Sequence, residues 1–400
     1  MKNYSNRSPK ARVKLERMNA ALSHKEPDRV PISDFFWGSF VRNWQKEFNL
    51  AANVSPYDYY DLDWIVTVPN MDPHIRNFET IREDDKEVVV RTGFDATLRK
   101  KFDLPMPEPI DWEVNTIEKL EAFVFDDPAD KRRFFSAGDN QIGGVGDGFT
   151  RNSPPWVDTV KAIHENFPVY GSIVESSECL TRLIGQLNTM MWIGEYPERF
   201  GQQILRIGKF YIESLVAQIE AADGLLDGMV IWGDVAYRNG MFFSPDYWRT
   251  YFKPTVKAMI EICHRNNLPV IYHGCGNVMS ILPDFIEMGL DAYNPLEAKA
   301  GLDVVELRKK FNHRLAFCGN SNIQIWEDGD PDKVRHEVLR KLHAARGGGI
   351  IFQSDHSVSS NVSPQTYDYI VKLVRQYGRY PLDQNVINKE LALHAAQLSQ

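Results

Sequence analysis

The chain has 400 residues, and 43% of them are hydrophobic, which is enough to bury one large core or two ordinary ones. The net charge of −8 argues against nucleic acid or an anionic membrane as a partner. No apolar window of about 18 residues predicts a membrane span, and the four cysteines are too few and too far apart for a disulfide scaffold. The basic N-terminal stretch lacks the apolar segment of a signal peptide, so we expect a cytoplasmic protein.

Short apolar runs bounded by turn residues recur along the chain and predict eight strands. They span residues 30–36, 63–68, 168–174, 228–234, 268–273, 291–295, 314–318 and 349–355. Helical patterns lie between the later runs, at residues 196–222, 245–266, 278–288, 304–311 and 331–345. This alternation predicts a parallel sheet in an α/β fold, and eight units fit a (β/α)8 TIM barrel better than an open doubly wound sheet, which is the alternative. No glycine-rich phosphate loop follows any strand, which weakens that alternative.

About a hundred residues separate the second and third predicted strands, which is too many for one crossover. Residues 87–101 are predicted to form a β-hairpin with its turn at residues 93–95, and the proline-rich residues 105–109 to be extended. We expect a single barrel domain over residues 1–400, in which residues 69–167 form an insertion over the barrel mouth that shapes substrate access.

The motif His273-Gly274-Cys275-Gly276 follows the fifth predicted strand. Residues i and i+2 of a strand point to the same side, so the imidazole of His273 and the thiol of Cys275 are directed at one point. The glycines allow the backbone to turn and a ligand to approach closely. A histidine nitrogen with a cysteine sulfur suits zinc, although the spacing alone leaves open a core histidine beside a buried free cysteine.

Polar residues gather at the predicted strand ends, where the chemistry of a barrel takes place. The strand bodies are apolar while their ends carry acids, thiols and imidazoles, a division that packing alone does not explain. In chain order these residues are Glu175, Glu178, Asp234, Tyr237, His273, Cys275, Glu297, Cys318, Asn320, Asp355 and His356. We expect Asp234, Tyr237 and Glu297 to be the catalytic residues, as acid or base groups or as groups that bind the substrate.

Several of these residues have a structural alternative. Asp234 could cap the next helix or turn, Glu297 could be a surface residue, and Cys318 is flanked by apolar residues as a core cysteine would be. The aromatic residues after the first strand belong either to the core or to the wall of a bulky, partly apolar pocket. The substrate-binding residues that we expect are Phe36, Trp37, Glu175, Glu178 and Asn320.

Several segments together resemble the uroporphyrinogen decarboxylase superfamily. They are residues 16–22 and 24–31, Ser244-Pro245-Asp246-Tyr247-Trp248, His273-Gly274-Cys275-Gly276-Asn277, Cys318-Gly319-Asn320 and the closing stretch 349–364. The resemblance covers nearly the whole chain and is weakest in the insertion. It implies a (β/α)8 barrel, which agrees with the strand count.

The superfamily contains decarboxylases and zinc-dependent, corrinoid-linked methyltransferases. Decarboxylases carry an arginine-rich loop after the first strand that binds the carboxylates of the porphyrinogen, but here residues 35–43 contain only Arg42. A substrate with many carboxylates would lack its counter-charges, so the chain resembles the methyltransferase branch more than the decarboxylases.

The resemblance also implies a set of zinc ligands. Methyltransferases of this kind use a His-x-Cys pair, which His273 and Cys275 match, and a second cysteine after the last strand, where residues 355–357 read Asp-His-Ser. We therefore expect His356 as the third ligand, with Cys318 in reserve, and an open fourth position as in catalytic zinc sites.

The activity that the resemblance implies is methyl transfer between cobalamin and a small methyl ether, amine or thiol. We favour demethylation of the small molecule, with the methyl group passing to cob(I)alamin. No Asp-x-His-x-x-Gly corrinoid-binding motif is present, because Asp72-Pro73-His74 lacks the glycine and Asp355-His356 has the wrong spacing. Cobalamin should therefore arrive on a separate corrinoid protein that docks over the barrel mouth, and a homodimer stays open as a further assembly.

Two other functions stay open. One is a metal-free lyase of the decarboxylase type, which would use Asp234 or His356 to move protons at a smaller carboxylated substrate. The other is a non-catalytic barrel that binds a small ligand or partner, against which the many titratable groups at the mouth argue. Metal content separates the lyase from the methyltransferase.

Overall fold

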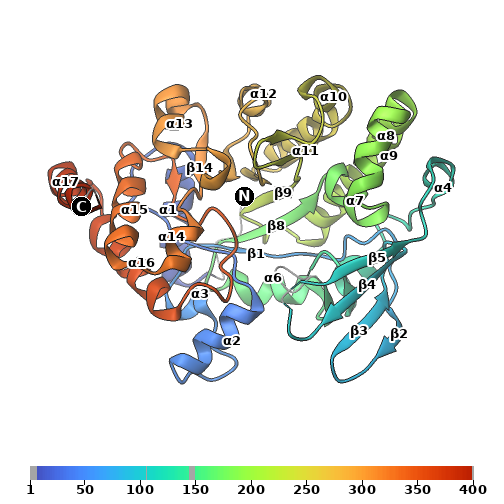
Figure 1. Ribbon diagram of the computed structural model, residues 1–400, viewed down its shortest axis with the longest axis horizontal. Helices are drawn as coiled ribbons and strands as arrows, with labels where there is room; N and C mark the ends of the chain where they lie inside the picture. The colour runs from blue at the N-terminus through green and yellow to red at the C-terminus, as the bar shows by residue number, and fades with distance from the viewer. Residues whose placement is uncertain (1–6, 105, 144–148, 399–400) are drawn as a thin grey trace.

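A seven-stranded parallel sheet forms the centre of the molecule (Figure 1). The structure is a computed structural model that describes residues 7–104, 106–143 and 149–398, with side chains up to residue 393. In spatial order the strands are β1 (Ile65–Val66), β8 (Val169–Val174), β9 (Gly228–Trp232), β12 (Val270–Gly274), β13 (Ala292–Pro295), β14 (Ala316–Cys318) and β15 (Ile350–Ile351). Seven of the predicted strands thus lie side by side in chain order, and every neighbouring pair is parallel, as predicted.

The first predicted strand, residues 30–36, forms isolated bridges in place of a regular strand. Phe352 N–H donates to the Pro31 carbonyl (2.8 Å), and Asp63 N–H donates to the Ile32 carbonyl (2.8 Å). β1 and β15 are the two edge strands of the sheet. The two hydrogen bonds connect residues beside β15 with residues beside β1 through the segment at residues 31–32, so the sheet is curled as in TIM barrels. Pro31 has no N–H to donate, which explains why the ladder is short here.

Helices surround the curled sheet, some packed on it and others on neighbouring helices (Figure 1), and strands such as β8 are buried along their whole length. In the N-terminal part these are α1 (Pro9–Leu22), α2 (Gly38–Glu47) and α3 (Pro56–Tyr59). After β8 they are α7 (Ser176–Leu183), α8 (Gln186–Glu195), α9 (Pro197–Ala221), α10 (Pro245–Tyr251), α11 (Lys253–Arg265), α12 (Leu282–Glu287), α13 (Val304–Phe311), α14 (Ile323–Asp328), α15 (Pro331–Ala344), α16 (Pro364–Tyr377) and α17 (Gln384–Leu398), with the 3-10 turns η2 (Ala298–Ala300) and η3 (Asn312–Arg314). Within the described residues, no helix is both long enough and apolar enough to cross a membrane.

The helical pattern at residues 245–266 is divided into two helices, α10 and α11, which meet at Phe252. Pro254 stands in the first turn of α11, where its missing N–H is tolerated, whereas in the middle of a continuous helix it would break a hydrogen bond. The Ser244 hydroxyl accepts from Tyr247 N–H and caps the start of α10. A small antiparallel pair, β10 (Ala236–Tyr237) and β11 (Gly240–Met241), precedes α10.

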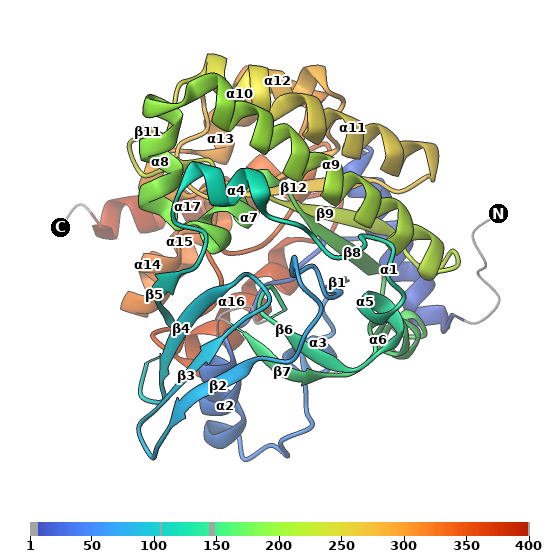
Figure 2. The ribbon, with the colours of Figure 1, turned by 90° about the vertical axis from the view of Figure 1, so that its right-hand side faces the viewer.

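The residues between β1 and β8 form a second, antiparallel sheet beside the central one (Figure 2). Its strands are β2 (Glu79–Glu83), β3 (Glu87–Arg91), β4 (Ala96–Lys101) and β5 (Glu108–Trp112), and the same region contains β6 (Gly138–Asn140), β7 (Thr150–Ser153), α4 (Ile117–Ala122), α5 (Arg132–Phe135) and α6 (Trp156–His164). The predicted hairpin is confirmed as β3 and β4. Its turn contains Asp95 with φ of 52°, a conformation that aspartate tolerates.

Candidate metal centre and its cavity

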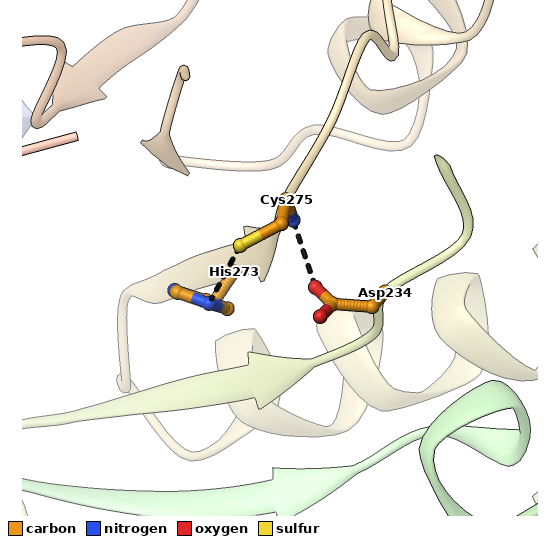
Figure 3. A group of neighbouring side chains, drawn as sticks. All are labelled: Asp234, His273 and Cys275. Atoms are coloured by element: carbon orange, nitrogen blue, oxygen red, sulfur yellow. Dashed lines mark hydrogen bonds between the residues drawn. The ribbon is translucent and has the colours of Figure 1, made fainter. Parts of the chain in front are cut away.

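A compact group of three donor side chains lies at the ends of β9 and β12 (Figure 3). Its members are Asp234, His273 and Cys275, and one donor atom from each lies within 4.8 Å of the other two. His273 and Cys275 come from one strand end, as their spacing predicted. Asp234 joins them because β9 and β12 pair in parallel with Trp232 opposite His273, so the two strands end side by side.

The hydrogen bonds around His273 determine which of its nitrogens is free. Asn294 donates through Nδ2 to the carbonyl of Cys318 (2.8 Å) and to Oε1 of Gln353 (3.1 Å), so its Oδ1 is the acceptor that faces His273. His273 Nδ1 must therefore carry the proton and donate it to Asn294. The lone pair of Nε2 is left facing the Cys275 sulfur at 3.8 Å, which is the arrangement that metal-binding histidines adopt.

Two carboxylates fix the backbone that carries Cys275. Asp234 Oδ1 accepts from Cys275 N–H (2.8 Å), and Glu297 Oε2 accepts from Gly276 N–H (2.9 Å). Gly276 has φ of 83°, and a Cβ there would lie 2.5 Å from the backbone of Ala236, so only glycine fits. The second oxygen of Asp234 stays available as a ligand.

Burial sets the charges of the donor group. It lowers the pKa of His273 to about 4, so the imidazole is neutral, and it raises the pKa of the Cys275 thiol well above its usual value. Burial, together with the nearby Glu178, raises the pKa of Asp234 to about 7. The Cys275 thiol ionises readily in this setting only beside a cation, and a cation would also favour the carboxylate form of Asp234. Imidazole, thiol and carboxylate within 4.8 Å therefore fit a zinc ion.

The donor group opens into a cavity of about 500 Å³, a size suited to a small molecule. Its apolar wall consists of Trp37, Val68, Leu98, Met106, Pro107, Pro109, Ile142, Val174, Trp232, Ala236 and Phe242. The polar residues that line it are Gln141, Glu178, Thr181, Arg182, Gln186, Asp234, His273, Cys275, His356 and Ser357. Residues 98–142 belong to the long segment between β1 and β8, so part of this segment borders the cavity.

The predicted third ligands occupy different environments. His356 lines the cavity, with its ring centroid 6.0 Å from that of Trp37, but in the described part of the chain it is outside the compact donor group. Cys318 is buried on β14, where its thiol donates to Gln353 Oε1 (2.9 Å). His356 thus faces the same space as the donor group, whereas Cys318 does not line it.

The other predicted site residues are divided between the cavity and its surroundings. Trp37 and Glu178 line it, and Glu178 accepts from Asp234 N–H (3.2 Å) and forms an ion pair with Arg182. Phe36 packs against Phe40, Tyr57 and Tyr367. Asn320 is fully buried and holds the backbone of three other residues, and Tyr237 is 49% exposed beside Phe242. Glu297 supports Gly276 from outside the cavity lining.

Glu175 is fully buried behind the site, and its pH response can be predicted. Its Oε1 accepts from the Ser177 hydroxyl, and Oε2 has no partner within the described residues. Burial raises its pKa to about 8, above the value of the unfolded chain, so the protonated form stabilises the fold. That stability is present below about pH 4.5 and is lost as the pH rises to about 8, at a rate on the order of 1 kcal/mol per pH unit.

We expect Glu175→Gln to remove this loss, so that the variant gains stability over the wild type between pH 5.5 and 7.5. Urea unfolding at the two pH values measures the difference. Glu195→Gln, at an exposed position of α8, is the matched control and should follow the wild type. Equal pH dependence of Glu175→Gln and wild type would show that Glu175 is ionised in the fold.

The sequence analysis did not single out several of the residues that line the cavity, among them Trp232, Arg182 and Gln141. Trp232 stands two residues before Asp234 at the end of one strand, so the i, i+2 rule could have identified it. Arg182 follows Glu178 by one helical turn on α7, which was also a usable signal. Gln141 comes from the irregular segment between β1 and β8, and no local pattern connects it with the barrel.

One solved structure is similar enough to agree with this architecture. A methyltransferase from Methanosarcina mazei has a similar structure, with a TM-score of 0.62 and 17% identity over 91% of this chain and 98% of its own. A B12-independent methionine synthase from Shewanella sp. W3-18-1 matches with a TM-score of 0.42 and 10% identity over 93% of this chain and 98% of its own. No curated protein sequence matches the chain significantly.

The family comparison is more specific than these structural similarities. Residues 150–377, more than half of the chain, match the family model described as uroporphyrinogen decarboxylase (URO-D). The matched region includes β8 to β15 and the whole donor group. The chain belongs to the uroporphyrinogen decarboxylase family.

Proposed function

We propose that the protein is a zinc-dependent methyltransferase that moves a methyl group from a small methyl ether or amine to the cobalamin of a separate corrinoid protein. The observation that carries the proposal is the donor group of Asp234, His273 and Cys275, which lines a cavity of about 500 Å³. Membership of the uroporphyrinogen decarboxylase family supports it, and the similar structure of a protein described as a methyltransferase makes methyl transfer the activity to test.

His273 Nε2, Cys275 Sγ and the free oxygen of Asp234 would hold the zinc ion. His356, the third ligand predicted from the sequence, faces the same cavity and is the candidate for a further position. A bound zinc would supply Lewis acidity to the substrate heteroatom that loses its methyl group.

The chain's own residues would orient the ligands and exclude water. Asn294 keeps His273 in the tautomer that can bind a metal, and Glu297 keeps Gly276 and hence Cys275 in place. Trp37 and Trp232 form an apolar wall that excludes water from the reacting methyl group. The corrinoid protein would dock over the cavity mouth, where residues 69–167 form an insertion on the barrel and shape access.

The test is the reaction of zinc-loaded protein with cob(I)alamin and a panel of methyl ethers and methylamines. Formation of methylcobalamin with at least one donor would support the proposal. The competing function is a metal-free lyase, for which the raised pKa of Asp234 offers a proton donor near pH 7. A metal-free lyase would still release carbon dioxide from a carboxylated substrate when all zinc has been removed from the protein.

We expect no decarboxylation of uroporphyrinogen at an ordinary enzymatic rate. Among the described residues that line the cavity, Arg182 is the only arginine, and it is paired with Glu178. Several substrate carboxylates would be buried without partners, at a cost of several kcal/mol. Product analysis after incubation with uroporphyrinogen measures this, and turnover on the order of 1 per second would contradict it.

A further inference from the structure

Three polar side chains outside the donor group, Gln141, Arg182 and Gln186, also line the cavity. Gln141 precedes β7, Arg182 lies near the end of α7, and Gln186 begins α8. None of the three belongs to the donor group or supports it directly. Their hydrogen bonds indicate what kind of ligand they fit.

The two glutamines have their oxygen atoms occupied by threonines. The Thr92 hydroxyl donates to Gln141 Oε1 (2.6 Å), and the Thr181 hydroxyl donates to Gln186 Oε1 (3.0 Å). Within the described residues, neither amide nitrogen has a hydrogen-bond partner. Each glutamine therefore has its N–H groups left for a ligand.

Arg182 adds a positive charge to the same wall. Its Nη1 binds the Glu178 carboxylate and the Glu178 carbonyl (2.9 Å), while Nε and Nη2 have no partner in the described part of the chain. Its side chain is 29% exposed, so these donors are within reach of a ligand. A guanidinium with free N–H groups suits the planar, two-oxygen geometry of a carboxylate.

The acids that line the cavity are already engaged. Glu178 is bound by Arg182 and by Asp234 N–H, and Asp234 accepts from Cys275 N–H and belongs to the proposed metal site. Among the described contacts of these two acids, only the second oxygen of Asp234 is without a hydrogen bond, and the proposed metal site uses it. An acceptor-rich, negatively charged group matches the unpaired donors.

We propose that Gln141, Arg182 and Gln186 form a carboxylate-binding subsite and that the methyl donor is a monocarboxylic acid with a flat apolar body. The second part rests on the proposed function, whereas the subsite does not. Arg182 binds the Glu178 carboxylate, which in turn accepts from Asp234 N–H, so Glu178 links the guanidinium to the donor group. The rest of the cavity lining is largely apolar, with residues such as Val174 and Trp232, and suits a flat apolar body.

The test is titration calorimetry of the full chain with 4-methoxybenzoate and with its neutral analogue 4-methoxybenzamide. We expect the acid to bind at least about tenfold more tightly than the amide, because charge-assisted hydrogen bonds replace neutral ones. The preference should persist after zinc is removed, since Gln141, Arg182 and Gln186 are not among the metal donors. A preference that disappears with the zinc would mean that the carboxylate binds the metal, and it would overturn the proposal.

A shape-conserving substitution removes the ambiguity of a folding defect. Gln186→Glu keeps the acceptor for Thr181 and replaces N–H donors with a second carboxylate oxygen. We expect this substitution to lower the affinity for 4-methoxybenzoate at least about tenfold, while the affinity for 4-methoxybenzamide changes by less than about twofold. Gln202→Glu, at an exposed position of α9, is the matched control and should change the binding of neither ligand. Equal weakening of both ligands, or of neither, would overturn the subsite.

The failure of this inference and that of the proposed function are distinguishable. If 4-methoxybenzoate binds through Gln186 and Arg182 but no methoxy acid or methyl ether supports methylcobalamin formation, the carboxylate subsite is supported and the proposed methyltransferase activity is contradicted. If neutral methyl ethers react as fast as acids in both wild type and Gln186→Glu, the methyltransferase stands and the subsite fails.

Discussion

Cys275→Ser is expected to abolish methyl transfer and to lower zinc affinity by at least about 10- to 100-fold. Loss of a residue that only supports a ligand already costs about this factor, so loss of a direct ligand should cost no less. Serine keeps the N–H that Asp234 accepts, so the local backbone should remain, but a hydroxyl ionises far less readily than a thiol and is a poor zinc ligand. Zinc content after dialysis, with the circular dichroism spectrum as a check on folding, measures the effect.

Cys318→Ser is the matched control for this change. The Cys318 thiol donates to Gln353, and a serine hydroxyl can donate in the same way, so zinc and activity should be retained. Loss of zinc from Cys318→Ser, with normal zinc in Cys275→Ser, would assign the sulfur ligand to Cys318 and contradict the proposed site.

Omission of the corrinoid is expected to stop turnover completely, because the chain has no corrinoid-binding motif and the methyl group then has no acceptor. With a cobalamin-loaded protein or a high concentration of free cobalamin, the cob(I)alamin absorbance should fall as methylcobalamin forms. Asp234→Ala and His273→Ala should each abolish this change, since each removes one of the three donors. Asp85→Ala, at an exposed bend, is the control that should leave the rate unchanged.

Equal consumption of substrate with and without the corrinoid would contradict this prediction. It would favour the metal-free lyase, and His356 would then be considered as an acid or base group instead of a ligand. The distinction is clear because a lyase needs no methyl acceptor.

The strands of the central sheet were predictable because each is a buried apolar run, as β8 and β9 are along nearly their whole length. The first strand was the exception: the run at residues 30–36 is apolar, but Pro31 cannot complete a ladder, and the pairing depends on distant residues such as Phe352. The break between α10 and α11 could have been inferred from Pro254, which a single continuous helix does not accommodate.

The candidate site was predictable where one strand supplies two residues, as with His273 and Cys275. The site was harder to predict where strand pairing determines which residues meet. Asp234 joins the donor group because β9 and β12 pair in register, and the sequence does not specify that register. Gln141 reaches the cavity from an irregular segment whose path depends on packing against the barrel. His356 as third ligand stays a prediction.

The measurement that tests the central claim most directly is the metal content of the full chain, purified with added zinc and then dialysed. The account predicts about one zinc per chain, bound tightly enough to survive dialysis, as three converging donors imply. X-ray absorption at the zinc edge should then show one sulfur among nitrogen and oxygen ligands. A folded protein that retains no zinc would contradict the metal centre and the methyltransferase built on it.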